Sequence, residues 1–227
     1  MKKTLYTGAI SLAFSAFFAV SPALAQEQTE STMADILLMQ PNAEVVFITT
    51  GGAEVRADWS EAANENFSTH MENQLEVGGH SLLIYEVAEE AAEEIEQLLL
   101  LQELVTQSIG LVMPHKSQAG QTNQDLSLGT TISSLREMYD ADYVLFTDHY
   151  SQIESGGVFL MQVAFAAGTG VAPPSQNLRF TRATVFDMET GDVVDTDIHM
   201  FGDPRDVGES STIVSNLLKD IEFGVAD

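Results

Sequence analysis

The stretch LRFTRATVFDMETGDVVDTDIHMF, residues 178–201, decides the fold class of this protein. Two runs rich in β-branched and aromatic residues, Leu178–Asp187 and Asp192–Phe201, flank the turn-forming segment Met188-Glu189-Thr190-Gly191. This order is typical of a strand, a tight turn and a second strand. It predicts an antiparallel hairpin near the end of the chain, and therefore a β-sheet.

The register of this hairpin bears on a possible metal site. A symmetrical turn places Arg182 opposite Asp197, as an ordinary cross-strand ion pair, and Phe180 opposite His199. Asp195, Asp197 and His199 alternate along the strand and share one face, a spacing that could bind a metal ion. Because Arg182 would already occupy that face, we predict no metal site here.

A second hairpin is predicted just before the first. The runs Tyr143–Ile153 and Val158–Ala167 flank Glu154-Ser155-Gly156-Gly157, a strong turn signal. Gly170–Ser175, which contains Pro173-Pro174, would connect the two hairpins into an antiparallel meander. In a symmetrical turn the opposed residues on one aromatic face are Phe146 with Phe165, Tyr150 with Met161, and Asp148 with Val163.

Asp148 and His149 are the two candidate binding residues of this hairpin. An aromatic face would place Asp148 among apolar neighbours, where an ionised carboxylate is costly unless it is paired. Either it is an acid with a raised pKa, or it is a strand-end carboxylate that reaches water or a backbone donor, and we favour the second interpretation. His149 would lie opposite Gln162 on the other, more polar face. The meander would send His149 and His199 toward opposite ends of the sheet, so that they share no metal.

The first half of the chain alternates strand and helix patterns. Apolar residues recur every three or four positions from Asp58 to Leu75, with Asp58 or Ser60 as the expected cap, and Gly78-Gly79 ends this helix. The fold class is therefore α/β (α+β): a single mixed sheet with an antiparallel C-terminal meander and helices packed on it. The other expected elements are strands at 35–39, 45–50 and 81–85, helices at 87–109, 131–140 and 211–221, and a long loop at 114–129.

The N-terminus has the pattern of a secretory signal. Lys2 and Lys3 precede the apolar run Leu5–Val20, and Ala23-Leu24-Ala25 supplies small residues for cleavage between Ala25 and Gln26. We therefore expect a signal peptide at 1–25, a flexible leader at 26–34 and a single α/β domain at 35–227. The mature protein should be periplasmic or secreted, without stable membrane insertion, because the apolar run is too short to span a bilayer.

Composition excludes several functional classes. The formal net charge of −25 argues against nucleic acid as a partner, since phosphate binding needs clustered Lys and Arg. The acidic surface serves solubility, or it recruits calcium or a basic partner. The chain has no cysteine, and no motif of a serine hydrolase, zinc protease or phosphate-binding loop. We therefore predict no cofactor, no catalytic residues and no enzymatic activity.

Two segments resemble a family of bacterial envelope domains. LREMYDADYVLF (135–146) and RATVFDMETGDVV (182–194) look like the helix–strand and strand–turn–strand steps of these α/β domains. The group includes the curli-secretion channel lipoprotein, the outer-membrane activator of penicillin-binding proteins and the TolB amino-terminal domain. The resemblance covers the second half of the mature chain. The sequence departs from the lipoprotein members because it has no lipid-acceptor cysteine, and because Asp195 stands where an aromatic residue often follows the second strand.

This resemblance implies interaction rather than chemistry. The first hypothesis is a non-enzymatic protein that docks onto another cell-envelope protein. The second is a periplasmic protein that binds a small ligand or a divalent cation, and the third is a hydrolase whose site is not located. A large exposed apolar patch would favour docking, and a deep pocket with converging polar groups would favour ligand binding or catalysis.

Overall fold

The computed structural model describes residues 35–86, 92–112, 126–175, 177–221 and 223. The predicted signal peptide and leader, the cleavage point between Ala25 and Gln26, and residues 114–125 of the predicted loop lie outside these ranges. The fold within them is a mixed α/β arrangement with a seven-stranded sheet, which confirms the predicted fold class. The strands are β1 (Asp35–Leu38), β2 (Asn42–Thr49), β3 (Gly52–Val55), β4 (Ser81–Ile84), β5 (Tyr143–Glu154), β6 (Arg179–Asp187) and β7 (Val193–Met200).

Strand β5 is the centre of the sheet. Its start pairs in parallel with β1 (Ile36 with Tyr143), and its later part pairs in parallel with β2 (Asn42 with Asp148). Because β6 pairs antiparallel with β5 over most of its length, β1 and β2 share the opposite edge of β5. The chain between β1 and β2, at Met39–Pro41, therefore runs alongside the middle of β5. Strand β4 pairs with β1, β3 with β2, and β7 with β6.

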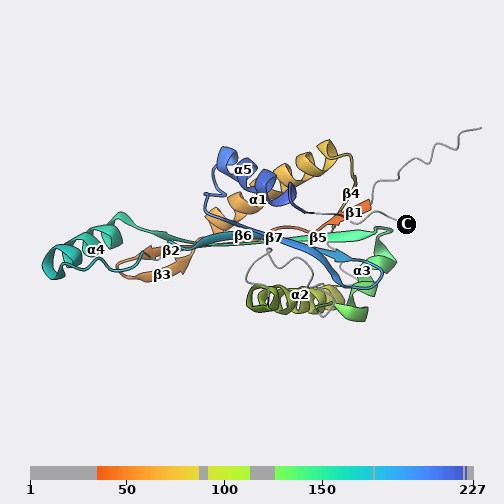
Figure 1. Ribbon diagram of the computed structural model, residues 1–227, viewed down its shortest axis with the longest axis horizontal. Coiled ribbons are helices and arrows are strands. Elements are labelled where there is room, and N and C mark those ends of the chain that lie inside the picture. The colour runs from red at the N-terminus through yellow and green to blue at the C-terminus, as the bar shows by residue number, and fades with distance from the viewer. Residues whose placement is uncertain (1–34, 87–91, 113–125, 176, 222, 224–227) are drawn as a thin grey trace, which may run out of the picture. The chain divides into compact units, whose positions relative to one another are not determined.

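Helices cover both faces of the sheet (Figure 1). Helices α1 (Ala57–Val77) and α5 (Val207–Leu218) pack on one face, where Phe67 and Leu217 are fully buried with apolar residues of β1, β2, β5 and β6. Helix α2 (Ala92–Val112) and the short α3 (Ser133–Met138) pack on the other face, where Leu98 and Phe186 are buried. The period that predicted α1 is confirmed, since Phe67 and Met71 lie on its buried side.

Local details correct several predictions. Helix α1 begins after Arg56, and neither Asp58 nor Ser60 caps it. Ser60 instead accepts a hydrogen bond from the Val45 amide, at 3.0 Å, which ties the helix to β2. The short strand β3 was missed, and the predicted helix at 131–140 is a 3₁₀ turn, Gly129–Ile132, followed by α3.

The hairpin predicted at 143–167 is wrong. Only its first strand exists, as β5, and its second half is helix α4 (Gly156–Thr169). The Ser155 side chain caps this helix by accepting a hydrogen bond from the Val158 amide, so Gly156 and Gly157 start a helix rather than close a turn. The opposed pairs predicted across this hairpin, including Asp148 with Val163, are therefore wrong as well.

The hairpin at 178–201 is confirmed, but its register shifts. Phe186 lies opposite Val193, as a symmetrical turn requires. An irregularity between Val185 and Phe186 then moves the pairing by one residue, which is the effect of a β-bulge. As a result Arg182 lies opposite Ile198 rather than Asp197.

Candidate functional site

Asp148 lies in the middle of β5, on the sheet face that α2 covers. Its Cα partner across the ladder is Arg182 of β6, whose Nη2 approaches Asp148 Oδ2 at 3.6 Å. Gln102 of α2 donates a hydrogen bond from Nε2 to the same oxygen at 3.1 Å. The Asp148 side chain keeps 20% of its exposure, and it lies in the middle of β5 rather than at a strand end as we favoured from the sequence.

The contacts of Asp148 belong to a small polar network that fastens α2 to the sheet. Arg182 Nη1 donates to the Thr106 carbonyl at 2.7 Å, and Gln102 Nε2 also lies 3.2 Å from Thr106 Oγ1. Gln102 and Thr106 are one turn apart on α2 and are both buried. Helix α2 therefore contacts the sheet through apolar side chains and through hydrogen bonds to the Asp148–Arg182 pair, which joins β5 and β6.

Burial raises the pKa of the Asp148 carboxyl, against the opposing effects of the Gln102 hydrogen bond and the Arg182 charge. The nearby charge of Glu103 raises this pKa slightly further. The direction agrees with the interpretation of Asp148 as an acid with a raised pKa, which we had not favoured. A carboxylate in this position is incompletely compensated by its present neighbours.

Replacing Arg182 by methionine is expected to lower the free energy of unfolding by about 2–3 kcal/mol, because Asp148 would be left part-buried without its cation. The second substitution Asp148→Asn in the same chain should restore much of this loss, since no charge then remains unpaired. Urea denaturation of the two single variants, the double variant and the native chain measures both effects. Additive losses in the double variant would contradict the pairing.

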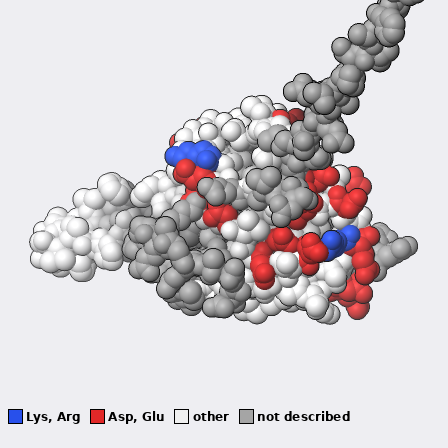
Figure 2. Space-filling model, turned by 45° about the vertical axis from the view of Figure 1, so that its right-hand side comes forward, with Lys and Arg blue, Asp and Glu red and all other residues white. Residues whose placement is uncertain are grey.

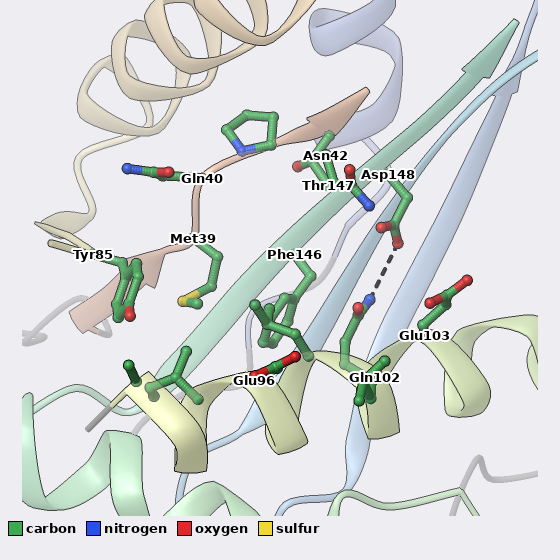
Figure 3. A pocket seen from close by; sticks show the side chains of 15 residues that line it. Met39, Gln40, Asn42, Tyr85, Glu96, Gln102, Glu103, Phe146, Thr147 and Asp148 are labelled. Atoms are coloured by element: carbon green, nitrogen blue, oxygen red, sulfur yellow. Dashed lines mark hydrogen bonds between the residues drawn. The ribbon is translucent and has the colours of Figure 1, made fainter. Parts of the chain in front are cut away.

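A pocket of about 500 Å³ opens between α2 and the sheet, beside Asp148 (Figure 3). Its walls come from the Met39–Pro41 link between β1 and β2, from the middle of β5 and from one side of α2. We call it the α2 pocket. Its lining residues are Met39, Gln40, Pro41, Asn42, Tyr85, Ala92, Ile95, Glu96, Leu99, Leu100, Gln102, Glu103, Phe146, Thr147 and Asp148.

His149 points to the opposite face of the sheet from Asp148. It is only 3% exposed and lies 5.5 Å from the Phe67 ring, measured between centroids. Its Nδ1 shares a hydrogen bond of 2.8 Å with Thr181 Oγ1, whereas Nε2 is buried without a partner among the described residues. The prediction of a more polar face opposite Gln162 is therefore wrong, and the two candidate residues do not form one site.

Burial lowers the pKa of His149 to about 4, while Asp203 raises it and Arg179 lowers it to smaller extents. His149 is therefore neutral at pH 7 inside the protein.

The predicted separation of His149 and His199 is also wrong, because both residues pair with Thr181 and so lie at the same level of the sheet. Within the described ranges, no group of three or more His, Asp or Glu side chains could hold a metal ion. The spacing of Asp195, Asp197 and His199 therefore does not assemble such a group.

Helix α4 carries the largest run of exposed apolar residues in the described part of the chain. None of its residues is buried, and Leu160 is 67% exposed. No charged residue occurs between Glu154 and Arg179, in a chain that has 34 acidic residues. Figure 2 shows the end of the molecule around α4 without acidic or basic side chains. The exposed large apolar residues of this helix, which we call the α4 surface, are Phe159, Leu160, Met161, Val163 and Phe165.

The fold and these two features define a mixed α/β domain with an open, largely apolar pocket that includes three acidic residues, and with a separate apolar surface. No known protein family matches the sequence, and no curated protein matches it. In the described part of the chain, no helix is both long enough and apolar enough to cross a bilayer.

Comparison with solved structures finds similarity at a low level only. One is the lipoprotein GNA1162 of Neisseria meningitidis, with a TM-score of 0.32 and 10% identity over 74% of this chain and 79% of that one. Another is the C-terminal domain of LpoB from Salmonella enterica, with a TM-score of 0.29 and 15% identity over 77% and 87%. A third is a PelC dodecamer from Paraburkholderia phytofirmans, with a TM-score of 0.29 and 10% identity over 82% and 84%. All three likenesses are distant.

Proposed function

We propose that this protein is a non-enzymatic component of the cell envelope that docks onto another envelope protein through the α4 surface. The observation that carries the proposal is an uncharged helix without a single buried residue, in which five large apolar side chains are exposed. Helices of this kind are normally buried, and large exposed apolar patches mark interaction sites. The secretory signal predicted at residues 1–25 would deliver the protein to the envelope.

The energy available from covering the α4 surface is sufficient for a specific complex. Full burial of a Phe, Leu, Met or Val side chain contributes roughly 1.5–3 kcal/mol. The five residues of the α4 surface are each about half exposed or more, so their burial supplies on the order of 5 kcal/mol before the costs of association. Contacts of the partner with the neighbouring backbone would add to this.

The absence of charge supports a protein groove as the docking site. Elsewhere the acidic surface keeps the molecule hydrated and repels other acidic proteins. The stretch from Ser155 to Leu178 carries no charge that would have to be desolvated at an interface. Helix α4 has 14 residues, fewer than a helix needs to span a bilayer, so it suits a groove rather than a membrane crossing.

Site-specific photo-crosslinking in native envelopes tests the proposal. A photoreactive residue at Leu160, on α4, is compared with one at Val77, an apolar residue at the end of α1 that is 85% exposed. We expect a single dominant protein adduct from position 160 and none from position 77. Equal adducts from both positions, or adducts with lipid alone, would contradict docking through α4.

The substitution Phe165→Asp is expected to weaken this adduct by at least ~10-fold, because docking would bury an unpaired carboxylate. It should leave the thermal unfolding midpoint almost unchanged, since α4 contributes no buried residue to the fold. The control Thr169→Asp places the same charge at the end of the helix, beyond the α4 surface, and should retain most of the adduct. Loss of the adduct together with loss of the fold would mean that α4 is structural.

A further inference from the structure

We propose that the α2 pocket binds an organic cation: an amine or guanidinium group carried on an aliphatic or aromatic body. This inference goes beyond docking, because the α2 pocket and the α4 surface share no residue. It rests on the size of the pocket, on the separation of its apolar and polar ends, and on the sign of its charge.

The dimensions of the pocket suit a small molecule. Its volume of about 500 Å³ lies within the range of roughly 300–1,000 Å³ found for ligand sites. The floor is the middle of β5, which pairs with β6 along one edge and lies between the ladders to β1 and β2 on the other. The link Met39–Pro41, where the chain leaves β1 before it enters β2, provides one wall, and α2 provides the other.

Large apolar and aromatic side chains gather at one end of the pocket, where Gln40 and Glu96 also lie, and Asp148 lies at the other end (Figure 3). Tyr85 and Met39 lie at one end, next to the Phe146 ring. Asp148, Gln102 and Glu103 lie at the other end, where the hydrogen bond from Gln102 holds the Asp148 carboxylate in place. A ligand that fills the pocket must therefore be apolar at one end and polar at the other.

The charge of the pocket lining as a whole selects a cation. Three lining residues are acidic, Glu96, Glu103 and Asp148, and none is Lys or Arg. Arg182 approaches Asp148 from β6, but both of the contacts that hold this carboxylate, from Arg182 and from Gln102, use Oδ2. Oδ1 is thus the oxygen that remains for a donor entering from the pocket. An ammonium or guanidinium group would form a charge-assisted hydrogen bond there.

The surroundings of Asp148 make such a cation favourable. Burial raises the pKa of this carboxyl in spite of Arg182 and Gln102, so the surrounding groups do not fully offset the cost of burying its charge. The carboxylates of Glu103 and Glu96, at the rim, add to the negative potential and would repel an anionic ligand. The apolar end argues for an organic cation rather than a metal ion, which would need further oxygen ligands.

A titration with matched probes tests the proposal. The probes are 2-phenylethylamine, its neutral analogue 2-phenylethanol and the anion 3-phenylpropionate, at pH 7. The readout is the shift of backbone amide signals in NMR spectra of the ¹⁵N-labelled protein. We expect the amine to bind at least ~10-fold more tightly than the alcohol, and the anion not to bind. The shifts should be concentrated at residues 146–148 and 95–103, with α1 and α5 as internal controls.

Two variants connect the binding to the acidic end. Asp148→Asn should weaken binding of the amine by ~10-fold while binding of the alcohol changes less than ~3-fold. Because this change also leaves Arg182 unpaired, the double variant Glu96→Gln/Glu103→Gln, at two exposed positions of α2, provides a second test with little risk to folding. It should weaken the amine by ~2–5-fold through the loss of potential alone. Phe165→Asp, on the α4 surface, should bind the amine as the native chain does.

Equal affinity for the amine and the alcohol would overturn the inference, because the pocket would then select only for apolar volume. Shifts induced by Ca²⁺ at residues 146–148 that the amine does not compete away would also overturn it. So would the absence of shifts with all three probes. Since Phe165→Asp separates the two sites, none of these results bears on docking through α4.

Discussion

Replacing Gly191 by alanine is expected to destabilise the fold by about 3 kcal/mol or more, one of the largest effects of a single methyl group in this protein. Gly191 has a φ of 77°, which L side chains rarely adopt. A Cβ atom built on it would lie 2.6 Å from the Gly129 carbonyl oxygen and 2.9 Å from the Gly129 nitrogen. Backbone atoms cannot rotate away as the end of a side chain can. The Leu128 amide also donates to the Gly191 carbonyl at 2.8 Å, so the two segments are held together at this point.

Gly170→Ala is the matched control for this effect. Gly170 ends α4 with a φ of 75°, nearly the same value, and a Cβ atom there would meet nothing within 4 Å. The substitution Gly170→Ala should lower the free energy of unfolding by only about 1–2 kcal/mol, because a residue with a Cβ atom disfavours the left-handed conformation. Urea denaturation of both variants measures the difference. Equal losses of stability in Gly191→Ala and Gly170→Ala would show that the close approach of residues 129 and 191 adds nothing to the cost of a Cβ atom at position 191.

The second large effect is a loss of stability in acid that depends on His149. The pKa of His149 is lowered to about 4 in the folded protein, from 6.5 for a free imidazole. Between these two pH values the unfolded chain binds the proton and the folded chain does not, so the free energy of unfolding falls as the pH falls. The loss begins below pH 6.5 and is complete near pH 4, where it reaches about 3 kcal/mol.

Comparison with His149→Gln isolates this contribution, because every other group titrates in both chains. The raised pKa of Asp148 acts in the opposite direction: its folded form takes up a proton first, which favours the fold as the pH falls. The measurement is the free energy of unfolding in urea from pH 7 to pH 4. The free energy of unfolding of the native chain, relative to that of His149→Gln, should fall steadily from pH 7 to pH 4. A constant difference would mean that His149 is accessible to protons in the folded state.

The sequence predicted the strands and helices where local signals were unambiguous. In the hairpin at 178–201, the Asp187 side chain accepts hydrogen bonds from the Glu189 and Thr190 amides of the turn. The residue types of this turn are typical of that geometry. Helix α1 buries one stripe with the expected period. Helix α4 was predicted as a strand because its β-branched and aromatic residues favour strands, and because its glycine pair looks like a turn. Only the serine cap before it pointed to a helix.

The candidate site shows where local reasoning ends. Asp148 was singled out as a carboxylate among apolar neighbours, but the structure surrounds it with the polar side chains of Arg182 and Gln102, which the sequence did not indicate. A symmetrical turn predicted that Arg182 lies opposite Asp197. A bulge shifts the hairpin register by one residue, and these residues carry no pattern that would have indicated it. Gln102 comes from a helix whose packing on β5 depends on the whole sheet. The burial of His149 likewise follows from α1 covering that face, which alternation alone cannot reveal.

The place of β5 in the sheet has a consequence for the order of folding. Strand β5, which pairs with β1, β2 and β6, lies far along the sequence from β1 and β2. The amide of Asp35 donates to the side chain of Asp142, 107 residues further along the chain. Chains with many such distant pairings fold slowly, because the entropy of loop closure is lost before the stabilising contacts form. The first half of this chain therefore stays without its central strand until residues 143–154 have arrived. We therefore expect the paired sheet to form only after residues 143–154 are available to pair with β1 and β2.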